Sequence, residues 1–241
     1  MSNTTGAAAV VPPRFRLKAA PFCPVAQTAK VALAVRGTPW IHDPTREDAP
    51  ARLLVHGGTG SNEASATVLA DPWEMLDRIE AEHPQSPLLP ADPAARAIAI
   101  NRTQTGLALR RCLSAVTRAT EPNECDVAVH SLRRRLEQAE VTLVREEGHE
   151  LGLVDVAFAP VLWRLRVLDE RRDAHLLDGL PGLRRWGAIL SSHPAVRVAL
   201  GPDPEDTYLA VLDTRGIVAS MADAVAWQLL LGHGRPLSGA G

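Results

Sequence analysis

Cys23 is the residue of this chain whose type and setting point most clearly to chemistry. It stands between an alternating apolar and polar run, Phe15–Ala19, which predicts a strand, and Pro24, which suits the first position of a helix. A cysteine in that place lies at or near a helix N-cap, where unpaired backbone N–H groups and the helix dipole stabilise an anionic sulfur. We therefore expect Cys23 to be a nucleophilic thiol at neutral pH, and the alternative is a small buried residue before a helix.

Short strands and two helices are expected to hold Cys23 in the first part of the chain. The helix that follows Cys23 is predicted to end before Gly37. A later helix has a strong start, with Asp71 as N-cap, Pro72 in the first turn and Glu74 three residues after the cap. The remaining segments predict a short strand over 38–41, a polar loop over 42–50, and a hairpin of 53–55 with 66–69 around a long glycine-rich tip.

The second part of the chain is predicted to be helical and to follow a proline-rich connection. Residues 83–93 contain four prolines and no hydrophobic period, which predicts a linker between two domains. Helices are predicted over 94–120, 125–147, 153–170 and 183–192, with a short turn at 195–200. Residues 217–231 have apolar positions suited to a helix that folds back over a cleft as a lid.

Composition excludes several classes of function. The 241 residues include 26 lysines and arginines and 28 acidic residues, a formal charge of -2, so no basic footprint for nucleic acid is expected. The three cysteines have no C-x-x-C spacing and the eight histidines no metal-binding spacing, which argues against a disulfide scaffold or a metal site. No stretch approaches the roughly 20 apolar residues of a membrane span, and residues 1–13 lack the features of a signal peptide. We expect a cytoplasmic protein with a disordered segment over 1–13.

The order of the expected elements resembles the glutathione transferase superfamily. Around Cys23-Pro24-x-Ala26-Gln27 the sequence is similar to the cysteine-type members, especially the omega and lambda classes and the related dehydroascorbate reductases. Further similarities are a linker motif at 82–93, a buried-helix motif that starts at Asp155, and motifs at 180–186 and 193–197. The resemblance implies an α/β plus all-α fold: a thioredoxin-like domain over 14–83, a linker over 84–93, an all-helical domain over 94–200 and an extension over 201–241.

The same resemblance implies an active site in the cleft between the two domains, with Cys23 as the nucleophile. It implies glutathione or another low-molecular-weight thiol as cosubstrate, bound near Phe22, Pro24, Pro50, Arg52, Leu53, Asp71 and Pro72. A small-molecule substrate would meet Arg110, Arg111 and Trp163, with a dimer or surface role as the alternative for the two arginines. The resemblance also implies a homodimer, and two-fold dimers are the commonest oligomers in general.

Three departures from the family pattern bear on function. Pro72 stands where the family has a serine that holds the γ-glutamyl end of glutathione, and proline offers neither a hydroxyl nor an N–H. Two lost charge-assisted bonds of about 1.5–3 kcal/mol each would weaken glutathione binding about a hundredfold or more. The family's cis-proline aligns with Arg52, so either the strand shifts to use Pro50 or the cis bond is absent. Gly152 replaces the serine or threonine of a helix cap, which predicts a weaker cap.

Two functions of different class remain open on the sequence. The first is an enzyme, as recruited in specialised metabolism, in which Cys23 serves thiol transfer, conjugation or isomerisation of a small electrophile. The second is a protein of this fold that has lost glutathione binding and acts as a cofactor-independent enzyme or as a binding or regulatory module. The Cys-Pro helix start favours the first function, and Pro72 favours the second.

Overall fold

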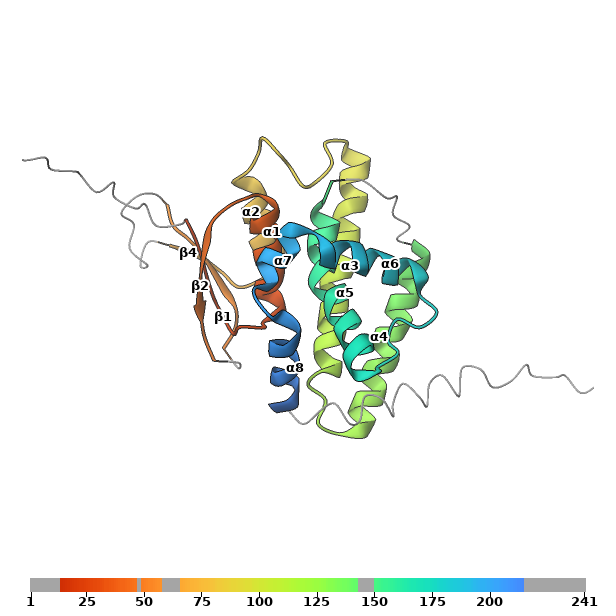
Figure 1. Ribbon diagram of the computed structural model, residues 1–241. Coiled ribbons are helices and arrows are strands. Elements are labelled where there is room, and N and C mark those ends of the chain that lie inside the picture. Colours follow the sequence, from red (N-terminus) through yellow and green to blue (C-terminus); the bar gives the residue numbers. More distant parts are fainter. Residues whose placement is uncertain (1–13, 47–48, 58–65, 143–149, 215–241) are drawn as a thin grey trace, which may run out of the picture.

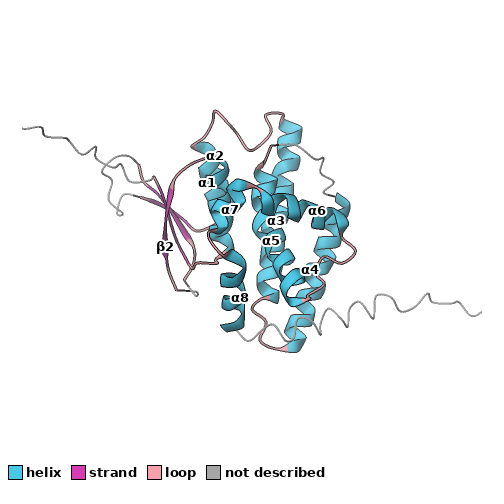
Figure 2. Cartoon of the chain, viewed as in Figure 1, coloured by secondary structure: helices cyan, strands magenta, loops and turns pink. Residues whose placement is uncertain are grey.

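The structure, a computed structural model, describes residues 14–46, 49–57, 66–142 and 150–214 (Figure 1). A small sheet with two helices forms one side of the molecule, and the remaining helices form the other (Figure 2). The elements of the sheet side are β1 (Phe15–Ala19), α1 (Pro24–Val35), β2 (Trp40–Pro44), β3 (Arg52–Val55), β4 (Thr67–Leu69) and α2 (Pro72–Ala81). Those of the helical side are α3 (Pro93–Val116), α4 (Pro122–Thr142), α5 (Leu153–Arg172), α6 (Pro181–Ser192), α7 (Pro194–Leu200) and α8 (Pro204–Thr214). The segment 1–13 and the helix predicted over 217–231 lie outside the described residues.

The sheet is mixed, with the strand order β2-β1-β3-β4. β1 pairs parallel with β2 and antiparallel with β3, and β3 pairs antiparallel with β4, which confirms the predicted hairpin. Phe15, Leu17 and Ala19 of β1 are buried, because alternate side chains of a strand point to one face. α1 and α2 lie between the sheet and the helical side (Figure 1), and α1 packs against α5 and α7. The turn from β1 to α1 is therefore held at the junction of the two sides.

α1 begins where the sequence predicts. Pro24 occupies the first turn, and Cys23 is the N-cap with an extended backbone, φ -62° and ψ 120°. Ala29 and Leu33 lie on the buried face of the helix. Gly37 follows the last turn with a φ of 62°, a left-handed conformation that glycine adopts without strain.

Several predicted boundaries shift by a few residues. β2 covers Trp40–Pro44 instead of 38–41, since each of its residues pairs with β1 and Asp43 forms an ion pair with Arg16 at 2.8 Å. α3 ends at Val116 instead of 120, where the Thr117 hydroxyl donates to a carbonyl of the last turn. α4 begins three residues earlier than predicted, because Pro122 fits a first helical turn. α8 is a helix that the sequence analysis did not predict.

The connection between α2 and α3 is held by a buried ion pair. Arg36 and Glu80 form this pair, and their side chains are 2% and 9% exposed. Glu80 also accepts the backbone N–H of Leu89 at 3.0 Å, and Arg36 donates to the Ser86 hydroxyl at 2.8 Å. Buried charges persist in a fold when they are paired and hydrogen-bonded. The proline-rich segment is thus fixed against α1 and α2.

α5 is the central helix of the helical side, as its apolar sequence predicts. Gly106 lets α3 approach it closely, since a Cβ at that position would lie 2.8 Å from the Phe158 ring. Near the start of α5, the Asp155 carboxylate accepts the indole N–H of Trp186 of α6 at 2.9 Å. None of the described helices is long and apolar enough to cross a membrane.

The glycine at the N-cap of α5 has a steric reason. The N–H of Gly152 donates to Asp155 at 2.8 Å, so half of a capping box is present. A Cβ on Gly152 would lie 3.2 Å from the carbonyl oxygen of Leu88, which accepts the N–H of Leu153 at 3.1 Å. The glycine therefore allows the segment before α3 to close over the helix start, at the cost of the side-chain cap.

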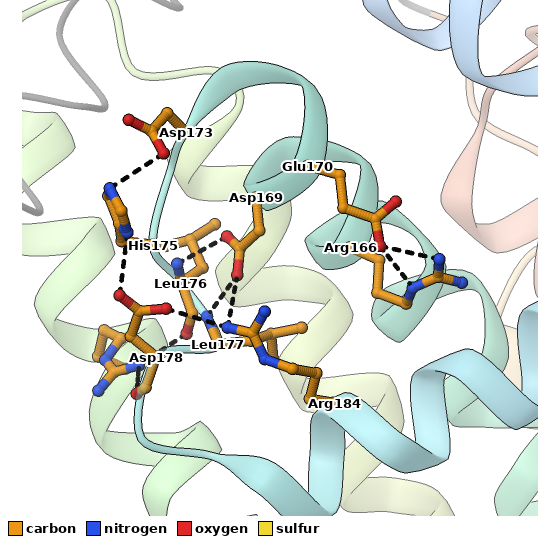
Figure 3. A network of polar contacts seen from close by, with 10 residues as sticks. Arg166, Asp169, Glu170, Asp173, His175, Leu176, Leu177, Asp178 and Arg184 are labelled. Carbon is orange, nitrogen blue, oxygen red and sulfur yellow. Dashed lines mark hydrogen bonds and ion pairs between the residues drawn. The ribbon is translucent and has the colours of Figure 1, made fainter.

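A polar network joins the end of α5 to the loop before α6 (Figure 3). The Asp169 carboxylate accepts the backbone N–H groups of Leu176 and Leu177 at 2.7 and 2.8 Å. Burial raises the pKa of Asp169, and these two hydrogen bonds oppose the shift. Because the carboxylate satisfies backbone groups of the loop, we assign the network a structural role.

Candidate functional site

Cys23 lies where the amides of a helix start are free to act on its sulfur. The first turn of an α-helix has four N–H groups without a partner inside the helix. The N–H of Cys23 donates to the carbonyl of Ala20 at 3.0 Å, and Pro24 has no N–H. Of the four residues at this helix start, Val25 and Ala26 are therefore the two whose N–H groups have no carbonyl partner in the helix. The Cys23 side chain makes no cap hydrogen bond, and the helix dipole adds positive potential at this end of α1.

Cys23 opens into a cavity of about 580 Å³ between the two sides of the molecule. Its walls come from the β1–α1 turn, the segment before β3, and α3, α5 and α8. Besides Cys23, the polar side chains among the described lining residues are Ser114, Thr117, Arg118, Arg164 and Tyr208, and none of these described residues is Asp or Glu. Two larger hollows, of about 960 and 830 Å³, lie beside α5–α7 and between α3 and α4, and no cysteine lines them. Within the described residues, the cavity at Cys23 is therefore the best candidate site.

Arg164 of α5 connects three walls of this cavity. It is 4% exposed, and its Nη2 donates to the carbonyl of Phe22 at 2.7 Å and to Oε1 of Gln27 at 2.5 Å. The guanidinium carbon also lies 5.3 Å from the centre of the Tyr208 ring of α8. The rings of Phe22, Tyr208 and Trp163 form a cluster with centres 5.5–6.4 Å apart. The position of the residue before the cysteine is thus fixed by α5 and α8.

Some of the residues predicted to bind a thiol cosubstrate lie near Cys23 in the structure, and others lie apart from it. Phe22, Pro24 and Pro50 line the cavity. Arg52 is exposed on β3, and Leu53 is fully buried in the core. No cis peptide bond occurs in the described residues, so the bond before Pro50 is trans. Of the two alternatives raised by the sequence, the absence of the cis bond is the one observed.

The start of α2 offers little to a ligand carboxylate. One oxygen of Asp71 accepts the N–H groups of Trp73 and Glu74 at 2.8 and 3.2 Å, which confirms the predicted N-cap. Pro72 stands in the first turn and has no donor. Asp71 and Pro72 come immediately after Ala70 in the sequence, and Ala70 lines the cavity at Cys23. The end of the cavity is therefore close to α2 but lacks the hydrogen-bond donors that the family pattern has there.

The three residues predicted to meet a substrate lie in three different places. Arg110 of α3 is within electrostatic range of the Cys23 sulfur and of Asp71. Arg111 faces away and lines the hollow between α3 and α4. Trp163 lies behind the Phe22 ring and lines the hollow beside α5–α7. Among the three, Arg110 is the residue that the fold brings near the thiol.

No protein-family model matches the sequence, and no curated protein matches it. Solved structures do match. Glutathione transferase Omega 3C of Trametes versicolor has a TM-score of 0.61 at 19% identity, over 77% of this chain and 88% of that chain. A tau-class glutathione transferase of Mangifera indica has a TM-score of 0.65 at 19% identity, over 83% of this chain and 98% of that chain. The chain has the glutathione transferase fold. The maleylacetoacetate isomerase of Anaeromyxobacter dehalogenans matches with a TM-score of 0.60 at 18% identity, over 79% of this chain and 93% of that chain.

The glutathione transferase fold accounts for the two sides of the molecule. The sheet with α1 and α2 is its thioredoxin-like N-terminal part, and the remaining helices are its all-helical C-terminal part. The prediction of this fold is confirmed. At such low identity the similarity concerns the fold, so the reaction has to be argued from the site itself.

Sequence reasoning missed several residues of the site in this glutathione transferase fold. Arg164 was passed over, although an arginine inside an otherwise apolar helix is a signal of a buried polar contact. Tyr208, the single tyrosine of the chain, lies in a segment that was treated as an extension. Ser114 and Arg118 follow Arg110 at intervals of four residues, and that spacing on a helix predicts a shared face.

A lysine and a histidine lie beside the strand that leads to Cys23. Nε2 of His42 is 3.0 Å from the Ala19 carbonyl and donates to it, so Nδ1 accepts from the Lys30 ammonium at 3.1 Å. Burial lowers the pKa of Lys30, and the Cys23 thiolate opposes that shift. Burial also lowers the pKa of His42, the charge of Lys30 lowers it further, and the bond to Ala19 opposes the shift.

We expect His42 to make the fold less stable as the pH falls through about 6.5. The unfolded chain binds a proton that folded His42 resists, so the free energy of unfolding rises with pH in this window. We therefore expect the free energy of unfolding of the wild type to exceed that of His42→Gln by more at about pH 7.5 than at about pH 5. Urea unfolding at the two pH values measures this difference.

The exposed His130 provides the matched control for this measurement. His130→Gln should leave the pH dependence of unfolding unchanged. Asp178 raises the pKa of His175, so His175 makes the free energy of unfolding fall as the pH rises. This contribution is the same in the wild type, His42→Gln and His130→Gln, and it cancels in their comparison. An unchanged pH dependence in His42→Gln would contradict the prediction.

Proposed function

We propose that the protein is a glutathione transferase-like enzyme in which Cys23 attacks a small electrophilic substrate. The observation that carries this proposal is the position of Cys23, at the N-cap of α1 and in the wall of a cavity of about 580 Å³. Matches that include transferases and an isomerase support thiol transfer, conjugation or isomerisation as the class of reaction. The three cysteines form no disulfide, which suits a reducing cytoplasm. A role in specialised metabolism and a homodimeric assembly are part of the proposal.

The residues at Cys23 support a nucleophilic step. In thiol transfer the Cys23 thiolate attacks one sulfur of a disulfide, a new S–S bond forms, and the other sulfur leaves as a thiolate. In conjugation or isomerisation it adds to an electrophilic carbon, and the electron pair of the broken π bond moves onto the activating group of the substrate. Isomerisation ends when the S–C bond breaks and the thiolate leaves. The amides of Val25 and Ala26 stabilise the sulfur anion at the start of each route and again when isomerisation releases it.

The cosubstrate in this proposal is a low-molecular-weight thiol, and the start of α2 fits glutathione poorly. One oxygen of Asp71 is engaged by two backbone N–H groups, and Pro72 has no donor for a carboxylate. A thiol can reach Cys23 through the cavity, but the γ-glutamyl group would find no hydrogen bonds from this helix start. We infer weak binding of glutathione or the use of another small thiol.

The alternative function follows from the same helix start. Pro72 and the missing donors favour a protein that has lost glutathione binding and acts as a cofactor-independent enzyme or as a binding or regulatory module. A module needs no reactive thiol, whereas the proposed enzyme does. The reactivity of Cys23 therefore separates the two functions.

A disulfide exchange reaction tests the proposed reaction class. With 2-hydroxyethyl disulfide at neutral pH, we expect a mixed disulfide on Cys23 that forms about tenfold faster than on the half-buried Cys112. The buried Cys125 should stay unmodified. Mass spectrometry of peptides, read cysteine by cysteine over time, provides the rates. A Cys23 that exchanges no faster than Cys112 would favour the module.

We expect calorimetry to show a glutathione Kd no tighter than about 1 mM for the wild type and a gain of about a hundredfold in Pro72→Ser. The serine hydroxyl and N–H would supply two charge-assisted hydrogen bonds. The matched control is Pro93→Ser, because Asp92 and Pro93 start α3 with the same cap and first-turn residues and do not line the cavity at Cys23. Micromolar binding to the wild type, or an equal gain in both variants, would contradict the assignment.

A further inference from the structure

One face of α3 presents positive charge and a hydroxyl toward Cys23. Arg110 and Ser114 are four residues apart and lie on one face of α3, and Arg118 lies in the turn directly after the helix. Ser114 and Arg118 line the cavity with Cys23, and none of the described residues that line it is acidic. In a chain with a formal charge of -2, this cavity is therefore a local region of positive potential.

Arg110 and Arg118 differ from the arginines that are paired with carboxylates elsewhere in the described residues. Arg133, Arg166 and Arg171 form ion pairs with carboxylates. Arg110 and Arg118 form no ion pair and no side-chain hydrogen bond with the described residues. The Nε atom of Arg110 is buried and without a hydrogen-bond partner there. A buried guanidinium donor without an acceptor costs free energy, which an incoming oxyanion would recover.

The charges around Arg110 also favour an anion. Burial lowers the pKa of Arg110, the Cys23 thiolate opposes this shift, and Arg111 and Arg118 add to it. Asp71 is the nearby acid that opposes the shift as well. Burial, Arg111 and Arg118 lower the pKa of Arg110 more than Asp71 and the Cys23 thiolate raise it. A further negative charge between Arg110 and Arg118 would therefore be stabilised.

We propose that Arg110, Ser114 and Arg118 form a subsite for a carboxylate of the electrophile that Cys23 attacks. Arg110 lies on α3 and Arg118 in the turn directly after it, and their long side chains can close around one carboxylate, with Ser114 between them. Phe22 and Tyr208, which line the same cavity, would contact the apolar body of the substrate. The substrate class is thus a small electrophile with a carboxylate and an apolar part. This inference rests on the proposed role of Cys23 as nucleophile.

Two alkylating agents of nearly equal size test the subsite directly. Iodoacetate carries a carboxylate and iodoacetamide is neutral; with both, an S–C bond to Cys23 forms and iodide leaves. We expect the ratio of the two rate constants at Cys23 to exceed that of N-acetylcysteine about tenfold, and to fall with added salt. In Arg118→Gln and Arg110→Gln the ratio should drop to within about twofold of the small thiol.

A variant on the same helix controls for net charge. Arg96 is exposed on α3 and lines none of the three cavities described above, so Arg96→Gln should keep the wild-type ratio. A wild-type ratio equal to that of N-acetylcysteine overturns the subsite. A drop of equal size in Arg96→Gln also overturns it, since the effect would then come from overall charge.

A second readout separates this subsite from the reactivity of Cys23. In Cys23→Ser, benzoate should raise the unfolding temperature more than benzamide does, and Arg118→Gln in the same background should remove the difference. If Cys23 reacts with neither alkylating agent, the proposed function fails, and the benzoate result alone decides the subsite. Equal effects of benzoate and benzamide would overturn it.

Discussion

Replacement of Cys23 by serine is expected to abolish the thiol chemistry of the protein while it leaves the fold intact. Iodoacetamide should label Cys23 about tenfold faster than Cys112 at pH 7, and the serine variant should lose this fast phase entirely. Cys112 lies within α3, away from a helix start, and Cys125 lies in the first turn of α4 but is fully buried, so neither combines a helix start with access from the cavity as Cys23 does. Labelling followed residue by residue with mass spectrometry measures both rates.

The serine variant is well suited to separate chemistry from stability. Cys23 makes no side-chain cap hydrogen bond, whereas serine is a preferred N-cap whose hydroxyl accepts from the first turn, so stability should be kept or rise by up to about 1 kcal/mol. Urea unfolding checks this. Slow labelling of Cys23 in the wild type, or turnover that survives in Cys23→Ser, would reduce the cysteine to a structural role.

Arg164→Met is expected to lower the free energy of unfolding by about 3 kcal/mol. Methionine can fill much of the space, but it leaves the Phe22 carbonyl and the Gln27 side chain without the donor that Arg164 supplies. A buried acceptor that loses its partner costs about 1–3 kcal/mol, and the contact with the Tyr208 ring adds to the loss. Urea unfolding gives the value, and Arg164→Lys, which can reach one acceptor, should lie between the wild type and Arg164→Met.

Arg166, two residues further along α5, is the matched control. It pairs with Glu170 one turn away in a partly exposed position, and such pairs contribute about 0.3–0.5 kcal/mol. Arg166→Met should therefore cost less than about 1 kcal/mol. A similar loss in the two methionine variants would show that Arg164 has no special role in joining the cavity walls. Because Arg164 holds the residue before Cys23, its replacement should also slow the alkylation of Cys23.

The placement of Cys23 could be predicted from sequence because its signals are local. The alternation of Phe15–Ala19, the proline after the cysteine and the glycine at 37 each restrict φ, ψ or a hydrogen bond within a few residues. Asp71 could be assigned as a cap for the same reason, since its acceptors and donors are two and three residues apart. The order of the predicted elements and the motifs between them carry the resemblance that predicts the glutathione transferase fold.

Element boundaries needed the structure, because neighbours in space decide them. β2 runs to Pro44 since β1 offers a partner to each of its residues. Gly152 looked like a defect in a helix cap, yet the Leu88 carbonyl next to it explains the missing side chain. In both cases the deciding partner is tens of residues away in the sequence.

The walls of the cavity were decided by the tertiary structure alone. Arg164 and Phe22 are 142 residues apart, and only the packing of α1 against α5 brings the guanidinium to that carbonyl. Tyr208 reaches the same turn because α8 packs beside it. The sequence determined a helix start with a cysteine, since backbone geometry and capping act between near neighbours. Which side chains surround the sulfur depends on how distant helices bury their apolar faces together, and that arrangement leaves no periodic trace in any one segment.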